Sequence, residues 1–226
     1  MTRDELLARY RHLRAINLRQ QNEALKFVAR GRIVEHGRRL GLAVGNTLVA
    51  DSEDELALAF DLAVYTGRGG RSRAINRYAH SVRPQPGSDE AMMLKAAQQA
   101  RFGVWHVKER HAVLGLTIWD PLAEAALWLL DEGLENSAPI GSVFAGRLLA
   151  VDNFVMTCGA IVPVVPDMLF EVDKNGPTLS GRSNVEKAQD PRFAEMVFRA
   201  AIRTGVAETV SYVASQDDFL DASQAA

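Results

Sequence analysis

The fold of this chain is decided by residues 102–166, which have the sequence FGVWHVKERHAVLGLTIWDPLAEAALWLLDEGLENSAPIGSVFAGRLLAVDNFVMTCGAIVPVVP. Five runs within it are short and rich in β-branched and aromatic residues: 105–109, 112–119, 125–130, 142–151 and 154–162. Turn residues such as Asp120-Pro121 separate the runs, which predicts sequential β-strands. We therefore expect a five-stranded antiparallel sheet that is strongly bent or closed into a small barrel. Gly146 and Gly159 each interrupt a run and are the expected bend or bulge positions.

The segments on both sides of this stretch have helical spacing. Thr2 with Glu5 and Ser52 with Glu55 form capping-box signatures, and apolar residues then recur every three or four positions. The predicted N-terminal helices cover 4–30 and 32–40, one opening at Ser52, one over 74–80 and one opening at Ser88. After the strands we expect a loop or linker over 167–189, helices over 190–216 and a frayed tail over 217–226. The predicted class is therefore α+β, with a helical region 1–101, a small β-domain 102–166 and C-terminal helices.

The composition is that of an ordinary globular protein. The chain has 226 residues, of which 47% are hydrophobic and 24% charged, so it can bury a substantial core. No apolar run reaches the roughly 20 residues of a membrane helix, and the N-terminus shows no signal-peptide core. We therefore expect a cytoplasmic protein with no membrane partner. Cys158 is the single cysteine, which excludes an internal disulfide and a cysteine-built zinc site, and no cofactor is predicted.

Charge is distributed unevenly along the chain. The formal charge is +6 over 1–44, −5 over 45–65, +5 over 66–84 and −8 over the remainder, for a total of −2. Such asymmetry can mark a surface for nucleic acid or for an acidic protein on the N-terminal part. The favoured alternative is a basic helical part that docks on the acidic remainder of its own chain or is simply exposed to solvent.

Several short motifs occur in a familiar order: LR at 13–14, Asn17, EAL at 23–25, DSEDELA at 51–57, RY at 77–78 and GSVFAGRL at 141–148. In this order the chain resembles a group of uncharacterised bacterial proteins that combine N-terminal helices with a small β-domain. The resemblance covers most of the chain and implies that architecture, without an assigned activity. Some strand modules of this type sit beside a cysteine-rich zinc motif like that at the C-terminus of the SecA translocation ATPase, which is missing here because Cys158 stands alone.

The loop GRGGRSR at 67–73 is the main candidate for binding an anion or nucleic acid. Glycines let backbone N–H groups approach a phosphate, arginines can pair with it, and the following helix N-terminus favours anions. The candidate residues are Arg68, Arg71, Arg73 and Arg77. The loop lacks the Lys-Ser/Thr end of a P-loop and does not match a dinucleotide fingerprint. The alternative is a helix connection that arginine keeps soluble.

Structural roles are expected for the other chemically active side chains. The five histidines show no metal-ligand spacing, Cys158 lies in an apolar strand as small core residues do, and Arg147 is the expected member of an ion pair. The aromatic residues of the strand runs can form a core or a stacking platform for single-stranded nucleic acid, and few basic residues interleave with them. These aromatic residues are Trp105, Trp119, Trp128, Phe144 and Phe154.

Three functional hypotheses follow. The first is a non-enzymatic protein-interaction or regulatory protein, whose partner is another protein or a second copy of the chain. The second is a nucleic-acid-binding accessory protein that uses the basic N-terminal helices and the segment from Arg68 to Arg77. The third is a hydrolase or transferase assembled from dispersed residues such as His111, Cys158 and a carboxylate, which requires a histidine within hydrogen-bond reach of the thiol.

Overall fold

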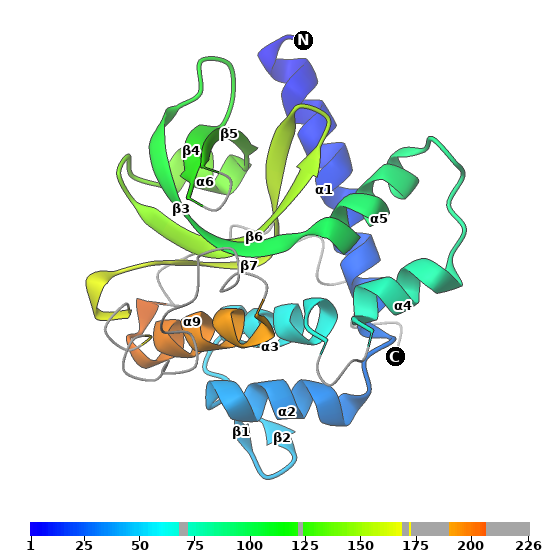
Figure 1. Cartoon of the computed structure of the whole chain (residues 1–226), viewed down its shortest axis with the longest axis vertical. Helices are drawn as coiled ribbons and strands as arrows, with labels where there is room; N and C mark the ends of the chain where they lie inside the picture. Colours follow the sequence, from blue (N-terminus) through cyan, green and yellow to red (C-terminus); the bar gives the residue numbers. More distant parts are fainter. Residues whose placement is uncertain (68–71, 122–123, 169–171, 173–189, 207–226) are drawn as a thin grey trace.

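The computed structural model describes residues 1–67, 72–121, 124–168, 172 and 190–206. A five-stranded barrel lies beside the long first helix, and further helices pack beneath and beside it (Figure 1). The helices are α1 (Arg3–Leu25), α2 (Arg30–Leu40), α3 (Glu53–Tyr65), α4 (Ala74–Ser81), α5 (Asp89–Gln99), α6 (Glu132–Ser137) and α9 (Pro191–Arg203). The barrel strands are β3 (Arg101–Arg110), β4 (Leu116–Asp120), β5 (Ala125–Leu130), β6 (Val143–Val151) and β7 (Phe154–Pro163).

The helices begin where the capping residues predict. Thr2 and Glu5 form a complete capping box at α1, and the side chains of Ser52, Ser88 and Asp190 cap α3, α5 and α9. Helix α1 ends at Leu25, earlier than expected. The predicted C-terminal helix beyond α9 and the tail 217–226 lie outside the described residues, as does almost all of 167–189.

The barrel is closed in the strand order β3-β4-β5-β7-β6. Strand β3 pairs with β6 through its first half and with β4 through its second half, which closes the sheet. The α+β class and the small barrel are confirmed, but the sheet is mixed because β5 and β7 run parallel. The physical reason is α6, predicted as a turn, which carries the chain from β5 across the barrel so that β6 pairs with β3. A closed five-stranded Greek-key barrel with this order has the topology of an OB fold.

The two expected irregular glycines allow this closure. The register between β6 and β7 shifts between Gly146 and Arg147. Opposite this shift, Gly159 has a φ of +79°, and a Cβ there would lie 2.2 Å from a carboxylate oxygen of Asp61. Only glycine fits that combination of backbone and space.

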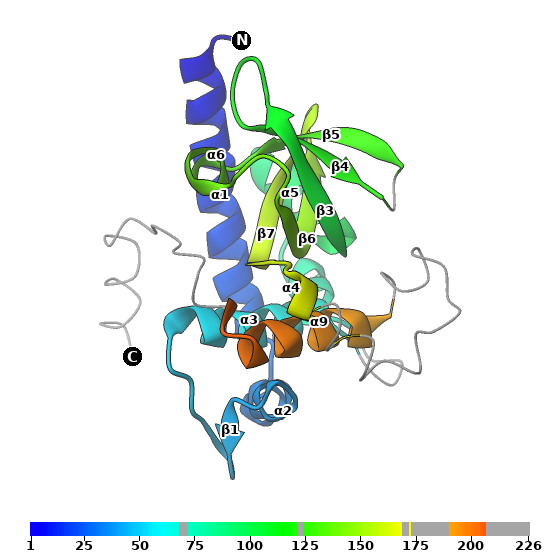
Figure 2. The same ribbon diagram turned by 90° about the vertical axis from the view of Figure 1, so that its left-hand side faces the viewer.

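Three clusters of buried side chains hold the molecule together. One fills the barrel interior and includes Trp105 and Ile118. The second joins α1, α4 and α5 to β7, and the third joins α3 and α9 to the barrel. Figure 2 shows α3 and α9 as a layer between the barrel and α2. The helices thus cover β6 and β7, whereas β4 and the outer half of β3 face away from them (Figures 1 and 2).

Candidate functional site

Two of the four predicted anion-binding arginines lie in the described residues. Arg73 is the N-cap of α4, and its guanidinium donates to the Gln98 carbonyl and to Asn76 Oδ1. Arg77 donates to the carbonyl oxygens of Ser72 and Phe27. Neither guanidinium has a carboxylate partner among the residues that the structure describes, so both retain their charge for other partners. Arg68 and Arg71 lie outside the described residues.

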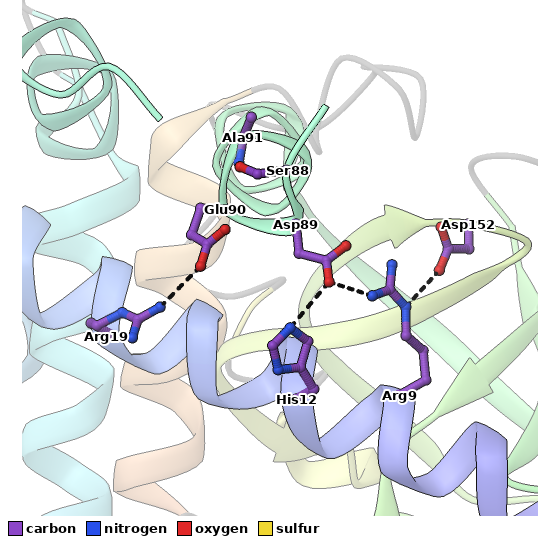
Figure 3. A network of polar contacts seen from close by, with 8 residues as sticks. All are labelled: Arg9, His12, Arg19, Ser88, Asp89, Glu90, Ala91 and Asp152. Carbon is purple, nitrogen blue, oxygen red and sulfur yellow. Dashed lines mark hydrogen bonds and ion pairs between the residues drawn. The ribbon is translucent and has the colours of Figure 1, made fainter. Parts of the chain in front are cut away.

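The basic residues of α1 are in a different situation, because acids of the same chain neutralise them. In Figure 3 the Asp89 carboxylate lies between His12 and Arg9, and Arg9 also reaches Asp152 in the turn between β6 and β7. Further ion pairs are Arg3 with Glu135, Arg11 with Glu132 and Arg19 with Glu90. The expected docking of the basic N-terminal part on the acidic remainder is thus confirmed for α1. The N-terminal helix therefore offers little free charge to a ligand.

A buried ion pair joins α3 to the barrel. Arg147 Nε donates to Asp61 Oδ1 at 2.9 Å, and the two side chains are 6% and 0% exposed. The guanidinium also lies 5.1 Å from the centre of the Tyr65 ring. Burial raises the pKa of the Asp61 carboxyl, and Arg147 opposes that rise. The predicted ion-pair role of Arg147 is confirmed.

Cys158 is buried beside Tyr65, the residue that also contacts Arg147. Its Sγ lies 2.8 Å from the Tyr65 hydroxyl, and Gln21 Nε2 contacts both groups. Burial raises the pKa of the thiol to about 11, so it is protonated at neutral pH. No histidine bonds to it in the described part of the chain, whereas His111 stacks on Trp128. The hydrolase or transferase hypothesis therefore loses its nucleophile.

The aromatic residues of the barrel divide between core and surface. Trp105 and Phe144 stack inside the barrel with ring centres 5.3 Å apart, as the core interpretation predicts. Trp128 donates its indole N–H to the Leu114 carbonyl beneath the stacked His111 ring. These rings are therefore unavailable to a ligand.

Trp119 is the exception. It is partly exposed on the outer side of β4, and it belongs to none of the three clusters formed by the described residues. Its direct neighbours across the sheet are His106 on β3 and the exposed Ala126 on β5. A small exposed neighbour leaves one side of the indole open. The strand sequence LTIWD places Thr117 and Trp119 on the opposite face from Leu116 and Ile118, and this two-residue period is the sequence signal for an outward Trp119. Its neighbours are identified only by the strand register.

The surroundings of Trp119 carry charges of both signs, and one of the exposed acids is Glu124, just before β5. The exposed residues at the outer end of β3 are Lys108, Glu109 and Arg110, and Lys108 stands at a bulge in the pairing with β4. On the other side of Trp119, the Asp120 carboxylate is taken up by Arg101. The sequence could not show which acids of the strand region are neutralised.

The match to a protein family spans nearly the whole described fold. A family profile matches residues 4–207. The chain belongs to DUF7986, a family of unknown function. Comparison of this DUF7986 member with curated proteins and with solved structures gives no match. The resemblance to uncharacterised proteins is therefore confirmed at the level of the family.

Two further properties of the DUF7986 structure bear on function. Within the described ranges, no group of three or more histidine, cysteine or acidic side chains is arranged to hold a metal ion. None of the helices traced there has both the length and the apolar character needed to cross a membrane. The chemical features that remain are the outer barrel face around Trp119 and the two arginines of α4, which have no carboxylate partner among the described residues.

Proposed function

We propose that this protein is a non-catalytic binding protein for single-stranded nucleic acid, with the outer face of β3, β4 and β5 as its binding surface. The observation that carries the proposal is Trp119, a partly exposed indole outside the clusters formed by the described residues. It lies on a face that the described helices leave open, in a barrel with OB topology. OB-fold barrels bind oligonucleotides and oligosaccharides across the face of their second and third strands, which correspond to β4 and β5 in this barrel. Because a fold alone does not fix a function, the proposal depends on this residue and its surroundings.

The chemistry of the face fits unpaired bases. Bases of a single strand can stack on an open indole whatever their sequence, whereas the bases of a duplex are already stacked on one another. His106 beside Trp119 adds a second flat ring, and Ala126 leaves room on the other side. The surface therefore suits a strand whose bases turn toward the protein.

The distribution of charge leaves part of the strand region open to a polyanion. Four of its acids are engaged in ion pairs, namely Asp120, Glu132, Glu135 and Asp152, whereas Glu109 and Glu124 are exposed. Arg73 bonds to the Gln98 carbonyl, three residues before Arg101 at the start of β3. Arg73 therefore lies near the segment that leads into β3.

The test is a titration of the full chain with a labelled oligothymidine strand, measured by filter binding at several salt concentrations. Replacing Trp119 by Ala should weaken binding by about 1–3 kcal/mol, the usual contribution of one stacked base. Trp119→Phe keeps a ring and should retain most of the affinity. Binding should also weaken steeply as salt rises, because phosphate contacts release counterions.

Two results would remove the proposal. One is absence of oligonucleotide binding at low salt by a chain whose circular dichroism shows it to be folded. The other is equal binding by the wild type and by Trp119→Ala. Binding of a neutral oligosaccharide in place of the oligonucleotide would also count against it, since the barrel topology is shared by both ligand classes.

A second candidate function is protein interaction, which the β1–β2 hairpin favours. Strands β1 (Ala43–Val44) and β2 (Thr47–Leu48) form a two-stranded sheet that projects below α2 (Figure 1). Val44 is 72% exposed and Val49 just after the hairpin is 52% exposed, and the two-stranded sheet has open edges that another chain can extend. The double variant Val44→Asp, Val49→Asp should lose a co-purifying protein that the Val113→Asp control retains. Retention by both variants would exclude the hairpin.

A further inference from the structure

Phe27 is more exposed than any other phenylalanine, tyrosine or tryptophan among the described residues. It lies in the turn between α1 and α2, is 36% exposed, and belongs to none of the three buried clusters. The N–H groups of Lys26, Phe27 and Val28 each donate to the carbonyl three residues earlier, which fixes the turn. The ring is therefore held at a defined place on the surface and is not part of the core.

Two successive residues of α4 contact Phe27. The Tyr78 ring packs edge to face against the Phe27 ring, with ring centres 6.0 Å apart. The Arg77 guanidinium donates to the Phe27 carbonyl oxygen at 2.6 Å and also to the Ser72 carbonyl oxygen. These two carbonyls engage only part of a guanidinium, which has five N–H donors. Phe27 thus presents exposed ring surface beside an oriented cation that has donors to spare.

Positive charge prevails around this ring. Arg30, the first residue of α2, is exposed three positions after Phe27, and its side chain makes no hydrogen bond or ion pair with another described residue. Arg77 is also exposed, and its partners in the described part of the chain are carbonyl oxygens. Lys26 is paired with Glu23 at the end of α1. Two arginines near Phe27 therefore keep their charge for a ligand.

An exposed ring beside two such arginines fits a single-stranded nucleic acid. An aromatic ring can stack on any base, and guanidinium groups pair with phosphate oxygens. An anionic membrane surface has the same sign of charge, but binding to it requires a continuous apolar face. Leu18, the next large apolar residue exposed on α1, lies more than two turns before Phe27. A single ring beside arginines therefore suits a base better than acyl chains.

We propose that the surface formed by Phe27, Arg30 and Arg77 is a second contact site for single-stranded nucleic acid, in which a base stacks on Phe27 and the adjacent phosphates pair with the two arginines. The inference rests on the proposed function for the class of ligand. In Figure 1 the turn between α1 and α2 lies at the end of α1 that is far from β4 and β5. A strand that reaches both places gains affinity from the two contacts together.

The experiment measures filter binding of a labelled oligothymidine strand to the folded full chain at low salt. The strand has about 30 nucleotides, more than one OB fold covers. Phe27→Ala should weaken binding about tenfold, as for one lost stacking contact, and Phe27→Tyr should restore it. Leu18→Ala removes a similarly exposed apolar side chain from α1 and is the matched control, with unchanged binding. Equal weakening in Phe27→Ala and Leu18→Ala, or none in either, would overturn the site.

The phosphate contact is tested through Arg30, since Arg77 also holds the Phe27 carbonyl. Arg30→Gln should lower the slope of log affinity against log salt by about one, as for one lost phosphate contact. Arg83→Gln removes an exposed arginine beyond the last residue of α4 and should leave the slope unchanged. A slope in Arg30→Gln equal to that of the wild type would overturn the phosphate contact.

The same titration separates this site from the proposed function. Weakening by Trp119→Ala alone, with Phe27→Ala and Arg30→Gln like the wild type, overturns the second site and supports the proposed function. Weakening by Phe27→Ala and Arg30→Gln, with Trp119→Ala like the wild type, supports the site and overturns the outer barrel face as the binding surface. Binding of phosphatidylserine vesicles that Phe27→Ala abolishes, without binding of the strand, would make this surface a membrane contact and overturn both.

Discussion

At the scale of single residues, Asp61 and Arg147 form the most buried ion pair of the described chain. Asp61→Asn should lower the free energy of unfolding by about 3–5 kcal/mol, because it leaves a buried guanidinium without its counter-charge. Urea unfolding followed by circular dichroism measures the loss. Asp54→Asn, on the same helix but only partly buried, should stay within about 0.5 kcal/mol of the wild type. If Asp61→Asn also changed the free energy of unfolding by no more than about 0.5 kcal/mol, the ion pair would contribute little to stability.

Cys158 gives a second prediction at this scale. Because the side chain is buried and its pKa is raised to about 11, the thiol should not react with a disulfide reagent at pH 7 to 8 while the protein is folded. Denaturant should release one reactive thiol per chain. The absorbance of the released reagent measures both states. Rapid stoichiometric reaction of the folded protein would contradict the sealed environment around Tyr65 and Gln21.

At the scale of elements, α1 is held to α5 and to the β6–β7 turn by ion pairs (Figure 3). The hydrogen bond from Arg9 lowers the pKa of Asp89. A carboxyl whose pKa is lowered by folding stabilises the protein above its ordinary pKa of about 4, and this contribution is lost as the pH falls through the lowered value. Asp89→Asn should therefore cost about 1 kcal/mol at pH 7, and the difference from the wild type should shrink in acid.

The control for this prediction is a double-mutant cycle. In an Arg9→Gln background, Asp89→Asn should cost much less than in the wild type, because the main partner is already gone. Urea unfolding at pH 7 and at pH 3 measures all four proteins. A cost that is equal at both pH values would mean that Asp89 acts through something other than its charge.

At the scale of the whole molecule, helices and barrel share their buried clusters. The cluster that contains Leu13 of α1 also contains Met156 of β7, and the one that contains Leu62 of α3 also contains Val162. We therefore predict a single unfolding transition, in which far-ultraviolet circular dichroism reports the helices and near-ultraviolet circular dichroism reports barrel packing. The two curves should coincide in urea. A helical signal that disappears first would favour the division at residue 101 into independent units, which stays a prediction.

The sequence contains the local signals of this fold, but not the pairing between segments that are far apart in the chain. The strand runs, the caps at Ser52 and Asp190 and the bulge at Gly146 depend on neighbouring residues, and their predictions agree with the structure. The parallel pairing of β5 with β7 is set by how the chain crosses the barrel after α6, which no local pattern records. For the candidate sites, the sequence identified Trp119 and Arg73 by residue type. Only the fold shows that Trp119 lies outside the core of the described residues and that Arg73 bonds to the Gln98 carbonyl.

The placement of the three tryptophans has a practical consequence for optical work. Trp105 is 1% exposed inside the barrel, Trp128 lies under the His111 ring, and Trp119 looks outward. Intrinsic emission from one unmodified sample thus contains three reporters with different surroundings. A nucleobase should quench Trp119, whereas Trp105 should keep its blue-shifted emission until the barrel itself unfolds.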